Sequence, residues 1–241
     1  MIHTINKVTD YLKSNPCVDA AYIVGSFANG VKIHDVDMLL IGNEFDKQVL
    51  QYHLVNDLGA TEVFVNDDSI ACHIDGVDFD FALLAVQSLL RRAENIAQMT
   101  LFAEHRNWCV GYWMPEGFLY DLRKAQVVIE KSSTVRECID GLLAGYGKTR
   151  RMLIEEIKKE IRLKSLLKKE LAHYNTIARS DVLAAFMRIA NLVEGWELTS
   201  FKHIDRKIRG TGYARELEML AEVPDEQFAP ACEAMLRRYF E

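Results

Sequence analysis

The stretch D-V-D-M-L-L-I, residues 35–41, constrains the fold more than any other part of the chain. It opens with two aspartates around a valine and continues as an unbroken apolar run, which is typical of a buried central strand. Successive side chains of a strand point to opposite faces, so Asp35 and Asp37 project to one face and Val36 to the other. The start of a buried strand therefore holds two like charges close together.

Two neighbouring carboxylates repel each other unless they are solvated, protonated or neutralised by a cation. A hard divalent ion with oxygen ligands is the usual partner of such a pair in proteins. Asp35 and Asp37 are thus expected to be metal ligands, and Mg²⁺ is the first candidate.

A second stretch, V-D-F-D-F-A-L-L at residues 77–84, repeats this geometry. The dipeptide Asp75-Gly76 before it is a strong hairpin signal, which predicts a strand pair on either side of the turn. Asp78 and Asp80 share one face of the second strand, so one of them can complete a site of three carboxylates. Such a site can hold two metal ions about 3.5–4 Å apart and clamp an in-line displacement at phosphorus. The pattern therefore predicts phosphoryl or nucleotidyl transfer.

A glycine-serine turn comes before the first aspartate pair. Residues 20–24 read as a short apolar strand that ends in Gly25-Ser26. Glycine permits close backbone approach, and the amides of the turn together with the Ser26 hydroxyl could bind phosphate oxygens. A turn of this kind is common without any function, so it gains meaning only in combination with the aspartates.

The combination of Val24-Gly25-Ser26, eight further residues, and Asp35-Val36-Asp37-Met38 resembles the signature of the DNA-polymerase-β-like nucleotidyltransferases. The resemblance covers roughly residues 1–85. It implies that Asp35 and Asp37 bind metal, that Gly25 and Ser26 bind the nucleotide, and that Asp80 is the third metal-binding and catalytic carboxylate. Asp78 remains a substitute for Asp80, which is preferred because an apolar continuation of the strand follows it. The implied reaction transfers a nucleoside monophosphate from a nucleoside triphosphate, ATP being expected, with two Mg²⁺ ions and release of pyrophosphate.

The resemblance also implies an α+β fold, in which a short mixed sheet with flanking helices precedes a mainly helical C-terminal domain. Strand and helix patterns mix up to about residue 85, and helical periodicity dominates afterwards. We expect a catalytic domain at 1–106 and a helical acceptor or interaction domain at 107–241. The second half is similar, more loosely, to the helical part of aminoglycoside- and lincosamide-type enzymes, which implies a small-molecule acceptor. Some of those relatives take a general base from a glutamate in this half, but the sequence selects neither Glu104 nor Glu130.

Composition narrows the partners. The chain carries 29 Lys and Arg against 35 Asp and Glu, a net charge of −6, so it has no overall positive field to gather nucleic acid. Five scattered cysteines fit reduced thiols and predict a cytoplasmic protein, and no apolar run is long enough to span a membrane. Transfer to a protein or RNA, and a noncatalytic nucleotide-binding or antitoxin-like partner, stay open as alternatives, as does a homodimer.

Overall fold

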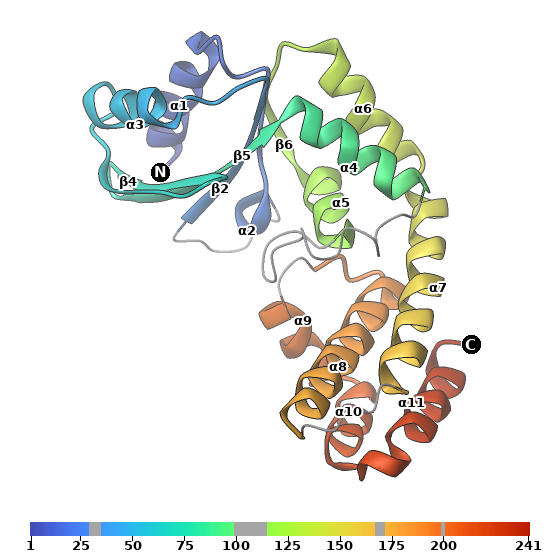
Figure 1. Ribbon diagram of the computed structural model, residues 1–241. Helices are drawn as coiled ribbons and strands as arrows, with labels where there is room; N and C mark the ends of the chain where they lie inside the picture. The colour runs from blue at the N-terminus through green and yellow to red at the C-terminus, as the bar shows by residue number, and fades with distance from the viewer. Residues whose placement is uncertain (29–34, 99–114, 167–171, 199–200) are drawn as a thin grey trace. The chain divides into compact units, whose positions relative to one another are not determined.

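The computed structural model describes residues 1–28, 35–98, 115–166, 172–198 and 201–241. The chain divides into two compact units, the first made of Met1–Thr100 with Asp121–Gly145, the second of Leu101–Tyr120 with Tyr146–Glu241. The helices and strands are drawn in Figure 1. No helix within the described ranges is long and apolar enough to cross a membrane.

The first unit is built around one mixed sheet, which has six strands in the described part of the chain, in the order β3-β4-β5-β2-β1-β6. β2 and β5 run parallel, and each of the other neighbouring pairs is antiparallel. The strands are β1 (Ala20–Ile23), β2 (Asp35–Gly42), β3 (Thr61–Val65), β4 (Ser69–Ile74), β5 (Val77–Ala85) and β6 (Gln126–Glu130). The helices that accompany them are α1 (Ile2–Ser14), the single-turn α2 (Gly25–Ala28), α3 (Lys47–Asn56), α4 (Val86–Gln98) and α6 (Ser133–Ala144). The helix α5 (Pro115–Lys124) is divided, with Glu116 in the second unit and Asp121 in the first.

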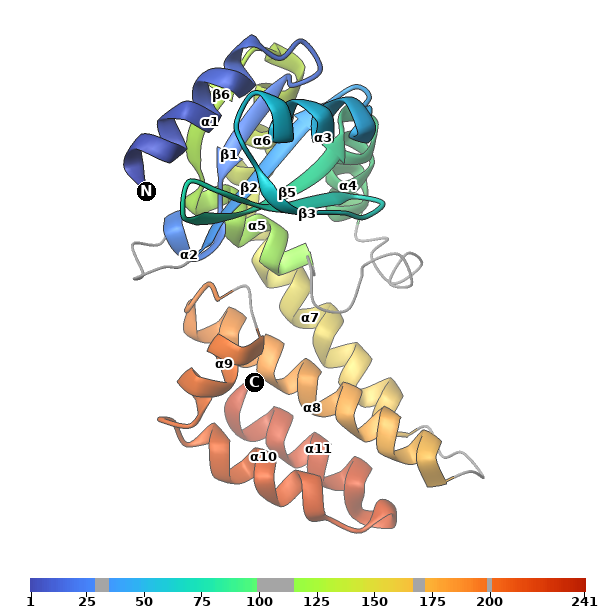
Figure 2. The same ribbon diagram turned by 90° about the vertical axis from the view of Figure 1, so that its left-hand side faces the viewer.

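The two faces of the sheet differ in chemistry. Along β2 the residues Val36, Met38 and Leu40 join a hydrophobic core with the buried sides of α1 and α3. Figures 1 and 2 show α1 and α3 on one side of the sheet and α4 and α6 on the other. Because side chains alternate along a strand, Asp35 and Asp37 project from the face opposite that core. The core thus fixes the strand and leaves its aspartates on the other side.

The hairpin before β5 forms as the sequence predicts. Asp75 and Gly76 adopt φ values of +48° and +83° between β4 and β5, and Ile74 pairs with Val77. Asparagine, aspartate and glycine accept such left-handed backbone more readily than other residues. The short turn fixes the register of β5 against β4.

The second unit is helical within the described residues. Its helices are α7 (Tyr146–Ser165), α8 (Ala172–Glu194), α9 (Phe201–Ile208), α10 (Tyr213–Glu222) and α11 (Asp225–Tyr239). Apolar side chains of α7, α8 and α11, among them Ile157, Phe186 and Leu236, are almost fully buried. The α+β class with a mixed sheet followed by a helical region is therefore confirmed.

The division of the chain differs from the single boundary expected at residue 106. Residues 126–130 form β6, which pairs with β1 across more than a hundred residues of sequence and so belongs to the sheet of the first unit. Five residues of strand inside a helix-rich stretch give too little periodicity to reveal this pairing. The segment after the expected boundary lies outside the described residues up to residue 114, and from Pro115 onward it is the helix α5.

Candidate metal centre

The parallel pairing of β2 with β5 brings the predicted carboxylates together. In this register Asp35 lies opposite Asp78 and Asp37 opposite Asp80. One carboxylate oxygen from each of Asp35, Asp37 and Asp80 lies within 4.8 Å of the others. Two oxygens bound to one Mg²⁺ ion at about 2.1 Å are at most about 4.2 Å apart, so small side-chain movements suffice for these residues to share a cation.

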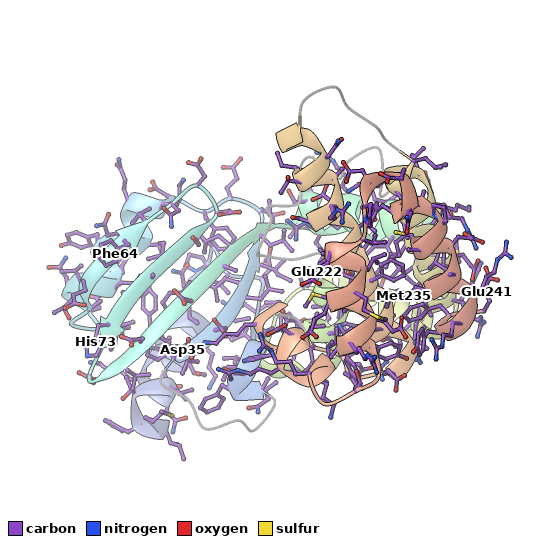
Figure 3. The ribbon with its side chains drawn as sticks, turned by 90° about the horizontal axis from the view of Figure 1, so that it is seen from below. Asp35, Phe64, His73, Glu222, Met235 and Glu241 are labelled. Atoms are coloured by element: carbon purple, nitrogen blue, oxygen red, sulfur yellow. The ribbon has the colours of Figure 1, made fainter. Side chains whose placement is uncertain are left out.

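The structure separates the two candidates for the third carboxylate. Asp78 lies 2.7 Å from Nδ1 of His73 on β4, and its side chain is 63% exposed. Asp80 is half-buried and belongs to the acidic cluster. Figure 3 shows the side chains of this sheet, with Asp35 and His73 labelled. Of the two aspartates on β5, the fold thus places Asp80 with Asp35 and Asp37.

The three-aspartate cluster is electrostatically unfavourable by itself. The pKa of Asp37 is raised to about 7, first by burial and then by the negative charges of Asp35, Asp80 and Asp121, while a hydrogen bond from the Ser26 backbone works in the opposite direction. The pKa of Asp80 is also raised, first by burial and then by Asp35 and Asp78. A divalent cation would compensate these charges, and carboxylate oxygens are the donors that Mg²⁺ prefers. The residues present therefore fit a magnesium site.

The backbone at Gly25 passes very close to Asp37. Gly25 has a φ of +66°, and a Cβ atom placed on it would lie 2.1 Å from Oδ2 of Asp37. The Val24 amide donates to the Asp37 carbonyl at 2.9 Å, which holds the end of β1 against β2 at this point. Only glycine fits both this conformation and this contact.

The predicted glycine-serine turn forms the single-turn helix α2, and its first two amides have partners in the protein. The Gly25 amide donates to Oδ1 of Asp121 at 3.2 Å, and the Ser26 backbone donates to Asp37. These two amides therefore hold carboxylates of the protein in this structure. Nucleotide binding by Gly25 and Ser26 stays a prediction, in which the Ser26 hydroxyl is the group left to contact phosphate.

Sequence reasoning missed Asp121. This residue lies on α5, is only 6% exposed, and adds a fourth negative charge near Asp37. Its signal was present in the run F-L-Y-D-L at residues 118–122, where one acid interrupts four apolar residues. Buried carboxylates are rare unless they have a partner, so such an interruption marks a residue with a specific contact.

The structure describes only one of the two glutamates that were candidates for the general base. Glu104 lies outside the described residues. Glu130 accepts a hydrogen bond from the Tyr22 hydroxyl at 2.7 Å and lies 3.4 Å from Nε of Arg136. Its register partner on β1 is Ala20, which pairs with Ile41, four residues and thus about 13 Å along β2 from Asp37. The structure does not bring Glu130 to the acidic cluster.

No protein-family model matches the chain, and no curated protein matches it. Among the solved structures that are similar to this chain, one matches 98% of this chain and 72% of its own length, with a TM-score of 0.43 and 14% sequence identity. It is the crystal structure of a nucleotidyltransferase-like protein from Exiguobacterium sibiricum 255-15. What the three aspartates can do is therefore decided by their own geometry and chemistry.

Proposed function

We propose that the chain is a metal-dependent nucleotidyltransferase that moves a nucleoside monophosphate from a nucleoside triphosphate to a hydroxyl of a small molecule and releases pyrophosphate. ATP is the proposed donor, and AMP the transferred group. The observation that carries the proposal is the convergence of Asp35, Asp37 and Asp80 within 4.8 Å, on neighbouring parallel strands. A charged cluster of this kind, held by a buried core on the opposite face of the sheet, is built to bind cations and their anionic partners.

Each residue of the centre would have a separate task. Asp35 and Asp37 would hold Mg²⁺ together with Asp80, and the bound ions would neutralise the charge of the triphosphate and stabilise the charge that develops at phosphorus. Asp80 would also accept the proton of the acceptor hydroxyl. The acceptor oxygen would form a bond to the α-phosphorus while the bond from this phosphorus to the bridging oxygen of the β-phosphate breaks, so that pyrophosphate leaves. The Ser26 hydroxyl would donate to the triphosphate.

The proposal is tested by calorimetric titration of ATP, GTP, CTP and UTP into the full chain with and without Mg²⁺. We expect Mg²⁺-dependent binding, tightest for ATP, that weakens at least about tenfold in the Asp35→Asn/Asp37→Asn variant because the cation loses two ligands. Asp78→Asn is the matched control. It removes a carboxylate from the same face of the same sheet, but this carboxylate contacts His73. This variant should bind as the wild type does.

Binding of no nucleotide at all would contradict the proposal and direct the search to protein partners. Equal binding by wild type and the double variant would show that the nucleotide site lies elsewhere. If ATP binds as expected, small hydroxyl compounds, proteins and RNA are then compared as acceptors by pyrophosphate release, and release only with a macromolecule would replace the small-molecule part of the proposal.

A further inference from the structure

Asp121 is a buried carboxylate beside a cluster that already has too much negative charge. Its side chain is only 6% exposed, and its charge contributes to the raised pKa of Asp37. Burial and like-charge repulsion both disfavour a carboxylate at this place. A residue that costs free energy in this way needs compensating contacts, and one of them is with the backbone of the neighbouring turn.

That contact is a hydrogen bond from the Gly25 amide to Oδ1 of Asp121, with a length of 3.2 Å. Hydrogen bonds to ionised acceptors are stronger than those between neutral groups. The bond reaches the one residue of the turn whose φ is +66° and whose backbone leaves no room for a side chain beside Asp37. Asp121 therefore acts on the conformation of the turn at its tightest point.

The turn at Gly25 and Ser26 holds Asp37 in place. The Ser26 backbone donates to the Asp37 carboxylate, and the Val24 amide donates to the Asp37 carbonyl at 2.9 Å. Contacts on either side of Gly25 thus hold both the side chain and the main chain of Asp37. A displacement of Gly25 would move these two donors and with them the carboxylate.

We propose that Asp121 is a positioning residue that, by accepting the Gly25 amide, holds the turn and thereby keeps Asp37 in place as a metal ligand. The inference rests on the proposed function only in taking Asp37 as a ligand of a divalent cation. The role belongs to the acceptor oxygen and not to the negative charge, because the oxygen makes the contact while the charge adds to the repulsion. Partners of this outer kind commonly determine metal affinity although they do not touch the metal.

The test compares Asp121→Ala, which removes the acceptor, with Asp121→Asn, which keeps an acceptor oxygen and removes the charge. Leu122→Ala is the matched control, since Leu122 is the next residue of α5 and is 4% exposed, so its truncation loosens the same helix and leaves the Asp121 carboxylate in the chain. Two quantities are measured on the full chain without nucleotide. One is the Mn²⁺ dissociation constant, and the other is the hydrogen–deuterium exchange rate of the peptide that contains Gly25 and Ser26.

We expect Asp121→Ala to weaken Mn²⁺ binding by about tenfold or more and to speed exchange at Gly25 by about tenfold. Asp121→Asn should stay within about threefold of wild type in both, because the amide oxygen replaces the carboxylate oxygen. Leu122→Ala should lower the melting temperature and leave Mn²⁺ affinity and exchange at Gly25 as in wild type. Equal loss in the Asn and Ala variants, or no change in either, would overturn the inference.

The two measurements separate this inference from the proposed function. Exchange at Gly25 needs no metal, so it decides whether Asp121 holds the turn even if wild type binds no Mn²⁺ and the proposed function fails. Conversely, if wild type binds Mn²⁺ and Mg²⁺-ATP while Asp121→Ala behaves as wild type in both measurements, the proposed function stands and the positioning role is wrong.

Discussion

Each unit of the molecule holds buried charge, and the two units handle it in opposite ways. In the second unit the buried guanidinium of Arg188 on α8 donates through two nitrogens to Glu116, and a third nitrogen lies 3.3 Å from Glu160. Lys164 adds a further contact to Glu160 at 2.8 Å. In the first unit Asp35, Asp37 and Asp80 form a cluster of a single sign. The first cluster is neutralised by side chains of the protein, whereas within the described residues the charged side chains that raise the pKa of Asp37 are all carboxylates.

The difference indicates which cluster serves the fold and which serves a ligand. A buried ion pair whose hydrogen bonds are satisfied is held by its own partners, and breaking it leaves an uncompensated charge. A group of like charges weakens the fold that contains it and gains from a cation. Removing a charge should therefore have opposite effects on stability in the two clusters.

The largest expected effect on stability is at the ion-pair cluster of Arg188, Glu116 and Glu160. Arg188→Met should lower the free energy of unfolding by about 3–5 kcal/mol, because Glu116 and Glu160 stay buried without their partner. The measurement is urea unfolding followed by circular dichroism. Arg162→Met is the matched control in the same unit, since Arg162 pairs with Glu233 and Glu241 at a side chain that is 40% exposed, and its loss should cost at most about 1 kcal/mol. Similar losses in the two variants would erase the contrast between the clusters.

The two clusters also differ in how far the sequence alone could predict them. Asp35 and Asp37 are two residues apart on one strand, so the alternation of side chains alone predicts that they share a face. Asp80 is on a different strand, and the alternation of side chains does not choose between it and Asp78. The resemblance favours Asp80, and the structure places Asp80 within 4.8 Å of Asp35 and Asp37 while Asp78 contacts His73 on β4. Arg188 and Glu116 are 72 residues apart, and no local pattern links them. Local geometry could be predicted, and partnerships made by tertiary packing could not.

The strand β6 and the residue Asp121 were missed for related reasons. β6 has five residues, and its pairing with β1 depends on a chain reversal that no short-range signal encodes. Asp121 interrupts an apolar stretch, which marks it as a residue with a specific contact, but the sequence does not identify the partner. Its meaning depends on the contact with Gly25, 96 residues earlier in the chain.

A smaller but still large effect is expected where the turn approaches the acidic cluster. Gly25→Ala should lower the free energy of unfolding by about 2–4 kcal/mol, because an alanine adopts a positive φ at a cost and its Cβ would collide with Asp37. Gly59→Ala is the matched control, since Gly59 has a φ of +70° and open space around its missing Cβ. It should cost only the backbone part, about 1–2 kcal/mol. Of the two variants, only Gly25→Ala should lower the Mn²⁺ affinity. Equal losses of stability in both variants would contradict the close contact between residue 25 and Asp37.

The smallest expected effect is a rise in the free energy of unfolding, and it tests the cluster of Asp35, Asp37 and Asp80. The pKa of Asp37 is raised to about 7 in the folded chain, while in the unfolded chain it takes its ordinary value near 4. The folded state therefore binds an extra proton between these two values, so the stability that this proton confers is present below pH 4 and is lost as the pH rises to about 7. Asp37→Asn removes the titration but keeps an acceptor for the Ser26 amide. Without metal, the variant should be more stable than wild type at pH 8 by on the order of 1–3 kcal/mol, and the difference should shrink toward pH 4.

Urea unfolding in the presence of a chelator, from pH 4 to pH 8, measures this difference. Asp78→Asn is the control, because its carboxylate is exposed beside His73 and lies outside the cluster of Asp35, Asp37 and Asp80. Saturating Mg²⁺ should then shift the difference at pH 8 toward wild type by up to about 2.7 kcal/mol, since a ligand at a hundred times its dissociation constant stabilises the folded state by that amount and the variant has lost a ligand atom for it. A wild type that gains stability over Asp37→Asn with rising pH in the absence of metal would mean that the cluster is compensated within the protein, as Arg188 is, and the reason to expect a cation there would be gone.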